Sequence, residues 1–211
     1  VINLIILFFV ILLSRREGGR IKKPIAGVCA FIDVFSLLLI ATALSKMILY
    51  INRFGMTAKR VTTSVFMIAL AFVFLALLIR LFCRKFPYMK FIVITTAVIS
   101  VSLGLADLET TIAQYNVSAY QNGALSRVDT AQLERMGGAA VPYIERLVTD
   151  KDPKIAEWAK EQLKERALFD HVSSAPGHDD DIRFFNVTTR RAKKILDKYL
   201  PADAKDPLTD E

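Results

Sequence analysis

The residue whose type and position most directly suggest chemistry is Asp33. It is the ninth residue of an apolar run, 25–44, that carries no other charge. A run of this length can span a bilayer as a helix, and an acid near the centre of such a helix costs roughly 3 kcal/mol to insert. The Asp33 side chain is therefore expected near the bilayer midplane, facing protein or water and not lipid.

Two interpretations of Asp33 stay open at the level of sequence. The first is a proton- or cation-coupled site in a transport bundle. The second is a structural residue that is protonated, or hydrogen-bonded to Ser36 on its own helix or to helices outside this sequence. The apolar runs offer no second carboxylate or basic partner near that depth, which favours the structural interpretation.

Polar and basic side chains also gather in the connector 46–60, KMILYINRFGMTAKR. One interpretation is a cationic rim that attracts an anionic ligand or a lipid headgroup. The alternative is interfacial anchoring by Tyr50 and Phe54, with the basic residues solvated. The candidate residues of this connector are Lys46, Tyr50, Arg53, Gly55, Thr57 and Arg60.

Other chemistry-bearing patterns are weak in this sequence. His171 and His178 are seven residues apart beside Asp170 and 179–181, a spacing that fits no zinc template, so 170–181 is predicted to be an acidic loop. The two cysteines, Cys29 and Cys83, form neither a disulfide framework nor a metal motif. No phosphate-binding loop, nucleophile elbow or catalytic pair of carboxylates is found, so we predict no catalytic residue, metal or cofactor.

The elements that must position these residues are apolar helices in the first half of the chain. The chain is 53% hydrophobic, and residues 1–106 carry 13 Lys and Arg against Glu17 and Asp33. The basic residues flank apolar runs as membrane flanks do, so nucleic acid is not expected as a partner. Since only helices and closed barrels span lipid, we predict transmembrane helices at about 1–13, 25–50, 61–83 and 89–106. The first is expected to continue a longer parent chain, whose upstream helices would be partners.

The balance of basic residues predicts an orientation. The connectors 14–24 and 80–90 hold five and four Lys and Arg, and both must lie on one side. The connector 46–60 holds four, so the first two connectors are expected to be cytoplasmic. Residues 107–211 would then be extracytoplasmic. Within the last span, Thr96, Ser100 and Gly104 form a stripe of small residues that predicts close helix packing.

Residues 107–211 are predicted to be a small helical extramembrane domain. The last transmembrane helix is expected to continue to about 121, and Asp129 to cap a short helix with Gln132. Helices from Pro142 to about 149, from Pro153 to about 167 and from 186 to 200 should follow, with a basic face on the last and a disordered acidic tail from about 202. The stretch 136–164 is either one HEAT-type helical pair or an ordinary helical hairpin.

Three stretches resemble the C-terminal part of a bacterial multi-pass membrane family of the domain-of-unknown-function kind. They are Met47–Arg60, Ile112–Tyr120 and Asp181–Leu196, with Met56 and Ile182 departing from the usual Leu and Trp. The resemblance implies a multi-pass protein of the bacterial inner membrane, cut from a longer chain, and it implies no activity. The matching positions are Tyr50, Gly55, Thr57, Arg60, Tyr115, Asn116, Arg183, Asn186, Arg191 and Ala192.

Together these patterns predict an all-α protein with four transmembrane spans followed by a helical domain. The favoured function is a non-enzymatic envelope or scaffold protein whose partners are the bilayer and, through 107–211, another protein. The alternative is the membrane part of a transporter that uses Asp33 as a coupling site. A third interpretation, a membrane enzyme, would need catalytic residues on upstream helices.

Overall fold

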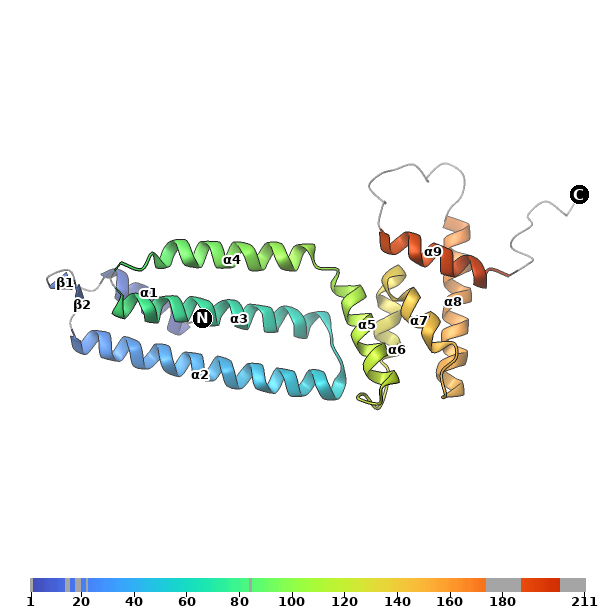
Figure 1. Cartoon of the computed structure of the whole chain (residues 1–211), viewed down its shortest axis with the longest axis horizontal. Coiled ribbons are helices and arrows are strands. Elements are labelled where there is room, and N and C mark those ends of the chain that lie inside the picture. The colour runs from blue at the N-terminus through green and yellow to red at the C-terminus, as the bar shows by residue number, and fades with distance from the viewer. Residues whose placement is uncertain are drawn as a thin grey trace, which may run out of the picture. The chain divides into compact units, whose positions relative to one another are not determined.

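A computed structural model describes residues 2–13, 16–17, 20–21, 23–83, 85–173 and 187–201. The chain divides into two compact units, residues 1–106 and 107–211, which we describe separately as unit 1 and unit 2. Nearly all described residues are helical, which confirms the all-α prediction (Figure 1). The exception is one antiparallel pair of two-residue strands, β1 (Arg16–Glu17) and β2 (Arg20–Ile21).

Unit 1 consists of long apolar helices that run side by side. They are α1 (Ile2–Leu13), α2 (Lys23–Phe54), α3 (Ala58–Phe82) and α4 (Tyr88–Leu105). The helix α3 packs against both α2 and α4, and α1 packs against α2 (Figure 1). The interior where these helices meet contains Cys29, Phe74 and Leu77, each at most 3% exposed.

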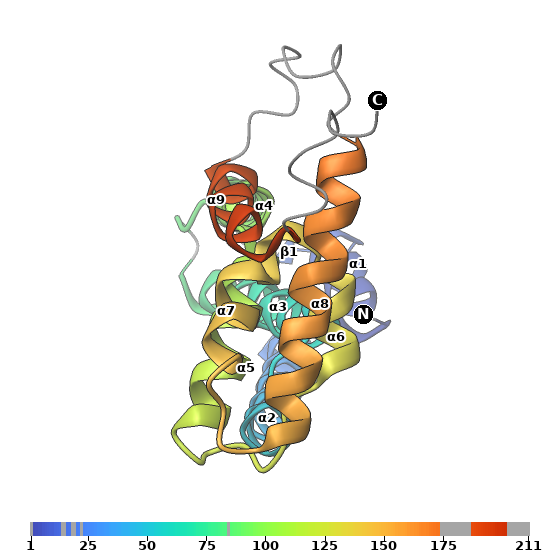
Figure 2. The ribbon, with the colours of Figure 1, turned by 90° about the vertical axis from the view of Figure 1, so that its right-hand side faces the viewer.

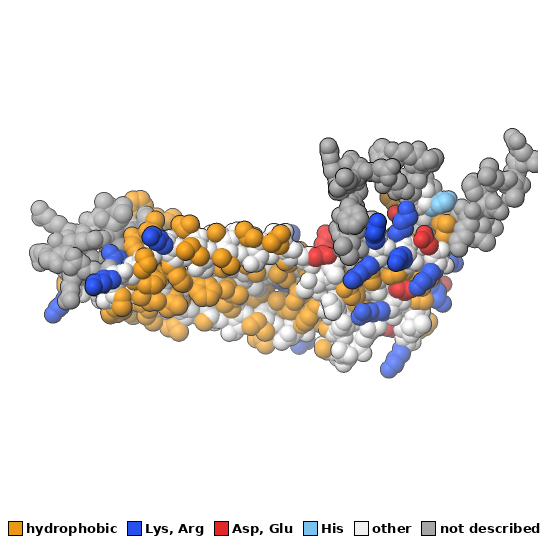
Figure 3. All heavy atoms as spheres, turned by 45° about the horizontal axis from the view of Figure 1, so that its top comes forward, with side chains coloured by type: hydrophobic (Ala, Val, Ile, Leu, Met, Phe, Trp, Pro, Cys, Tyr) orange, Lys and Arg blue, Asp and Glu red, His pale blue; other side chains and the backbone are white. Residues whose placement is uncertain are grey.

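Three helices of unit 1, α2, α3 and α4, are long and apolar enough to cross a membrane. Large apolar side chains cover the outer surface of this unit: Phe31 is 72% exposed and Val93 is 62% exposed. Figure 3 shows hydrophobic side chains along the visible face of these helices. Such a surface is unfavourable in water and is the surface expected in lipid.

Two boundaries in unit 1 differ from the sequence predictions. The helix α2 was predicted to end at about 50 and ends at Phe54, because Met47, Ile51 and Phe54 keep apolar side chains at helical spacing. The helix α4 ends at Leu105 instead of continuing to 121. Asp107 begins a new helix there by accepting a hydrogen bond from the Thr110 backbone N–H, 3.1 Å away.

The small-residue stripe of α4 is not covered by another described helix. Thr96, Ser100 and Gly104 are all exposed, and no atom lies within 4 Å of where a Cβ on Gly104 would be. None of the residues of α4 is buried. The predicted close packing of this stripe is therefore not found among the described residues of unit 1.

Unit 2 is a separate bundle of shorter helices with its own interior. Its core contains Ile112, Leu133, Ile144 and Leu163, each at most 1% exposed. The elements of unit 2 are α5 (Leu108–Gln121), α6 (Thr130–Arg135), the 3-10 helix η1 (Gly137–Ala140), α7 (Val141–Leu147), α8 (Pro153–Ser173) and α9 (Val187–Tyr199). The last helix, α9, packs against η1, α7 and α8 (Figure 2).

Capping residues in the sequence correctly predicted the starts of two helices in unit 2. Asp129 caps α6 by accepting from the Gln132 backbone N–H at 3.0 Å, as predicted, and Asp152 precedes α8 as expected. The predicted end of α8 near 167 is wrong, because the helix runs to Ser173 and includes the start of the predicted loop 170–181. The remainder of that loop and the acidic tail from 202 lie outside the described residues. The helices α7 and α8 pack together, and a HEAT-type relationship for them stays a prediction.

Candidate functional site

The strongest candidate in unit 1 is the interior face of α2. Three residues of this helix are buried, Cys29, Asp33 and Ser36, at spacings of four and three that place them on one face. The Asp33 side chain is 1% exposed. Its Oδ1 atom has no hydrogen-bond partner among the described residues. The structure thus places Asp33 facing protein, as the sequence indicated.

Ser36, one of the partners considered for a structural Asp33, forms its hydrogen bonds with other residues. The Ser36 hydroxyl donates to the Ile32 carbonyl oxygen at 2.8 Å and accepts from the Asn3 side-chain amide at 3.2 Å. A serine hydroxyl has one proton to donate, so the bond to Ile32 leaves none for the Asp33 carboxyl. Ser36 instead joins α1 to α2.

The depth of Asp33 follows from its distance to the turn between α2 and α3. Asp33 lies 21 residues before Phe54, the last residue of α2, and Arg80 lies 22 residues after Ala58, the first residue of α3. At about 1.5 Å per residue both lie about 32 Å from the turn. Asp33 is therefore level with the charged end of α3, whereas the sequence interpretation placed it mid-span because it ended the apolar run at Leu44.

The turn between α2 and α3 is held by residues that the sequence offered as a binding rim. Gly55 has φ +80 and donates its N–H to the Ile51 carbonyl at 2.9 Å. The Arg60 guanidinium donates to the Gly55 carbonyl at 2.6 Å and lies 6.0 Å from the Phe54 ring centroid. Thr57 caps α3 by accepting from the Arg60 backbone N–H. Gly55, Thr57 and Arg60 therefore have a structural explanation.

The remaining candidates of this region lie along one exposed stripe of α2. Lys46, Tyr50 and Arg53 are exposed and spaced by four and three residues, so they share a helix face. The Tyr50 ring stacks on Phe54 with 6.0 Å between centroids. This arrangement matches an interfacial aromatic anchor flanked by basic residues, and it forms no enclosed site.

Substitution of Gly55 tests whether this turn depends on its backbone conformation. An L-residue at φ +80 is strained, so Gly55→Ala is expected to destabilise the turn by about 1 kcal/mol. Hydrogen exchange measured by mass spectrometry on peptides covering 51–61 should then be about fivefold faster. Gly27→Ala is the matched control, because Gly27 lies within α2 with open space around it. Equal exchange in the two variants would contradict the prediction.

The described candidates of unit 2 are Tyr115 and Asn116 on α5 and Arg191 on α9. Asn116 is 5% exposed in the interior of unit 2, and its amide donates to Gln132 Oε1 at 3.4 Å. Tyr115, beside it, is half-buried on α5. Arg183 and Asn186 lie outside the described residues. A buried amide that joins α5 to α6 is a structural feature of the fold.

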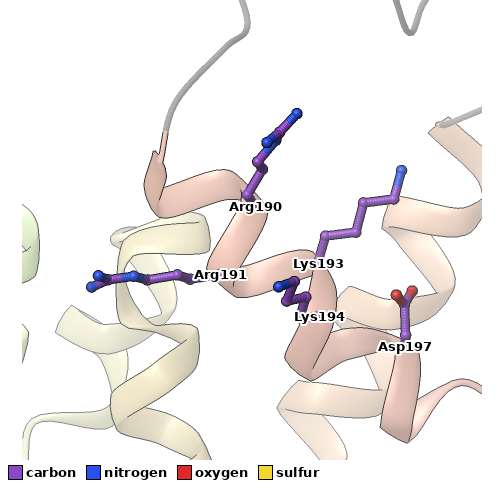
Figure 4. A pocket seen from close by; sticks show the side chains of 5 residues that line it. All are labelled: Arg190, Arg191, Lys193, Lys194 and Asp197. Carbon is purple, nitrogen blue, oxygen red and sulfur yellow. The ribbon is translucent and has the colours of Figure 1, made fainter.

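Arg191 lies on α9, whose exposed face is basic. Arg190, Arg191, Lys193, Lys194 and Asp197 line a shallow groove of about 360 Å³. Figure 4 shows Arg190 and Lys193 pointing to the same side as Asp197, whereas Arg191 points away from them. The opposite face of the helix packs into the core through Ala192 and Leu196. The cations diverge, so the described part of α9 offers a charged surface and no convergent anion site.

A polar cluster that the sequence analysis missed lies between α6 and α8. Arg166 donates to the carbonyl oxygens of Leu133 at 3.1 Å and Glu134 at 2.8 Å, and to that of Gly137. Trp158 Nε1 donates to Glu134 Oε1 at 2.9 Å. The available signal was spacing, because Arg166 follows Leu163 by three residues and so falls beside the apolar face of α8.

The charge of Arg166 is part of this arrangement. Partial burial lowers the pKa of the Arg166 guanidinium from its usual value, while the carboxylates of Glu134 and Glu165 act to raise it. An arginine stays protonated in proteins, so its donors remain available to the carbonyls at the end of α6. The Leu133 carbonyl also accepts from the Met136 backbone N–H at 3.3 Å, so Arg166 adds a charged donor to carbonyls at the end of α6, where intrahelical donors run out.

Comparison with known proteins gives a family but no activity. A protein-family model described as a domain of unknown function, DUF4153, matches residues 1–147. That range covers all of unit 1 and unit 2 as far as α7, and the predicted similarity at 181–196 lies outside it. No curated protein and no solved structure match the chain.

Proposed function

The chain belongs to the family described as Domain of unknown function (DUF4153), and from this premise we propose that it is a multi-pass protein of the bacterial inner membrane. Its second unit would serve as a helical interaction module outside the cytoplasm, with no catalytic role. The family description states neither a location nor an activity. Support for the proposal comes from the residues themselves.

The observation that carries this proposal is the contrast between the surfaces of the two units. Unit 1 exposes large apolar side chains along α2, α3 and α4, as a lipid-facing surface does. Unit 2 buries its apolar residues around Ile144 and Leu163 and exposes charged residues of both signs. A compact polar unit attached to apolar helices is suited to display a surface to a partner.

The polar side chains of unit 2 support a binding role over a catalytic one. Arg166 and Trp158 hold α8 against α6, Asn116 joins α5 to α6, and Tyr120 donates to Asp150 at 3.1 Å. These groups are occupied in holding the bundle. Arg191, Lys193 and Lys194 are exposed on α9 and form the surface that a partner of negative charge would recognise.

The native cysteines provide a test of this topology. Cys83 is exposed at the end of α3, and Cys29 is buried. With the connector 80–90 in the cytoplasm, a membrane-impermeant maleimide should label Cys83 in inverted vesicles and leave it unlabelled in spheroplasts. In a Cys83→Ser background, Ser126→Cys reports on unit 2, since Ser126 is exposed between α5 and α6. That variant should be labelled in spheroplasts.

The two cysteine probes are separated by α4, so they must lie on opposite sides if α4 spans the membrane. Labelling of both probes from the same side would contradict a spanning α4. Labelling of Cys83 in spheroplasts, together with labelling of Ser126→Cys in inverted vesicles, would reverse the proposed orientation. The variant without cysteines, Cys29→Ser with Cys83→Ser, gives the background labelling signal.

A second candidate function is the membrane part of a transporter, and the burial of Asp33 favours it. Carboxyl groups inside membrane helix bundles often take part in proton or ion pathways. An Asp33→Asn variant keeps the size of the side chain and removes the acid. Unchanged transport or growth in this variant, under conditions that depend on the wild-type protein, would argue against this candidate.

A further inference from the structure

Asp33 is a buried polar residue of unit 1, and the proposed role of unit 2 as an interaction module does not explain it. Its side chain is 1% exposed, and its Oδ1 atom has no hydrogen-bond partner among the described residues. Because it shares the interior face of α2 with Cys29 and Ser36, it is turned away from the lipid-facing surface. A buried carboxylate without donors is penalised by the loss of its hydration, whereas the neutral acid is penalised far less.

Neither Ser36 nor Asn3, which form a polar pair between α2 and α1, donates to Asp33 Oδ1. The Ser36 hydroxyl donates its one proton to the Ile32 carbonyl, and the Asn3 amide donates to Ser36 Oγ. The carboxyl therefore receives no stabilisation from the polar pair beside it. This distinguishes Asp33 from a structural aspartate, which would accept bonds from such neighbours.

The charged and titratable groups on the packed helices do not supply a counter-ion. The described helix α1 contains no ionisable residue, and on α2 the nearest ionisable side chain is the Cys29 thiol. On α3, Arg80 is level with Asp33, but its guanidinium lies 5.5 Å from the ring centroid of Tyr88. On α4, Lys90 is exposed. No ion pair to Asp33 is formed by these described residues.

We propose that Asp33 is a proton-binding site, which holds a proton in the interior of unit 1 at neutral pH and exchanges it on the side of the connector 80–90. The ligand is a proton and not a metal ion. A cation such as Ca²⁺ takes six to eight oxygen ligands, and the described residues contain no cluster of three or more His, Cys, Asp or Glu side chains. This inference rests on the proposed insertion of unit 1 in the membrane, and it gives the transporter candidate a ligand.

A hydrophobic carbodiimide tests the protonation state directly. Dicyclohexylcarbodiimide enters membranes and adds to protonated carboxyl groups to give a stable N-acylurea, which mass spectrometry locates on a peptide. The full chain is treated in native membrane vesicles at about pH 7, where an ordinary Asp is protonated in roughly one molecule in a thousand. The expected result is modification of Asp33 that persists at about pH 7 and falls as the pH is raised further.

Matched controls separate Asp33 from other carboxyls. Glu109 is exposed on α5 and should stay unmodified at the same pH, and the Asp33→Asn variant should give no adduct on the peptide that contains residue 33. An unmodified Asp33 at about pH 7, as for a carboxylate paired with Arg80, would overturn the proposal. Protection of Asp33 by added Na⁺ or Ca²⁺ at constant ionic strength would also overturn it, since the site would then bind a metal cation.

Alkaline carbonate extraction of the same vesicles distinguishes two kinds of failure. If the chain stays in the membrane pellet and Asp33 is unmodified, the proton site is wrong and the membrane proposal stands. If the chain is released, unit 1 is not inserted and the proposed function fails first. Modification of Asp33 in a chain retained by the pellet supports both.

Discussion

Replacing Arg166 with methionine is expected to lower the free energy of unfolding of unit 2 by about 3 kcal/mol, because charge-assisted hydrogen bonds contribute about 1.5–3 kcal/mol and their effects do not add fully. Methionine keeps the apolar stem of the side chain and removes the guanidinium. The carbonyl oxygens of Leu133 and Glu134 in α6 and of Gly137 in η1 then lose the hydrogen bonds from Arg166. The effect should be concentrated where α6 meets α8.

The single tryptophan of the chain makes this loss measurable in the intact protein. Trp158 lies in unit 2 and donates to Glu134, so its fluorescence reports the unfolding of that unit in a urea titration in detergent micelles. Lys164→Met is the matched control, because Lys164 is exposed on the same helix. Equal midpoints for the two methionine variants would show that the Arg166 contacts do not stabilise unit 2.

Leu163→Ala is the second substitution with a large expected effect. Leu163 is completely buried, and removing a buried leucine side chain costs about 2–5 kcal/mol through lost burial and the cavity that remains. We expect a loss of about 3 kcal/mol in the same Trp158 titration. The cavity would lie on the face of α8 that also carries Ala159 and Ala167.

The same helix offers a control with the same chemical change. Leu168 is 41% exposed, so Leu168→Ala is expected to change the free energy of unfolding by about 0.5 kcal/mol or less. A small effect of Leu163→Ala, similar to that of Leu168→Ala, would contradict the packing of α8 described for unit 2. A reduced urea dependence in place of a shifted midpoint would instead indicate a change in the unfolded state.

The sequence predicted the fold class because its strongest signals are local. Long uncharged runs predicted the helices of unit 1, and the Asp129 cap gave the start of α6. The ends of helices that lack a local stop signal, such as Gly or Pro, were harder to predict. Nothing between Leu44 and Gly55 or between Ala167 and Ser173 stops a helix, and in both places the structure continues it. The break at Asp107 was missed because the apolar spacing continues across it, although an N-cap residue is present.

The candidate site was predicted in part, because the sequence indicates where a side chain lies on its helix but not which distant residue it contacts. The cost of placing an acid against lipid correctly indicated that Asp33 faces away from the outer surface, and the structure buries it. The partner of Ser36 could not be predicted, because Asn3 comes from a helix 33 residues away in sequence. Arg166 was missed for the same reason, since its acceptors lie about 30 residues earlier and the contact depends on how α8 folds back on α6.

The unequal lengths of α2 and α4 have a consequence for the surrounding lipid. The 18 residues of α4 reach about 27 Å and the 32 residues of α2 about 48 Å, while a bilayer core is about 30 Å thick. A membrane that accommodates both must become thinner beside α4, and α2 must tilt or project into the headgroups. Acyl chains of short length would relieve the mismatch at α4 and increase the tilt or projection of α2, so the thickness of the host membrane becomes a variable that acts on this protein.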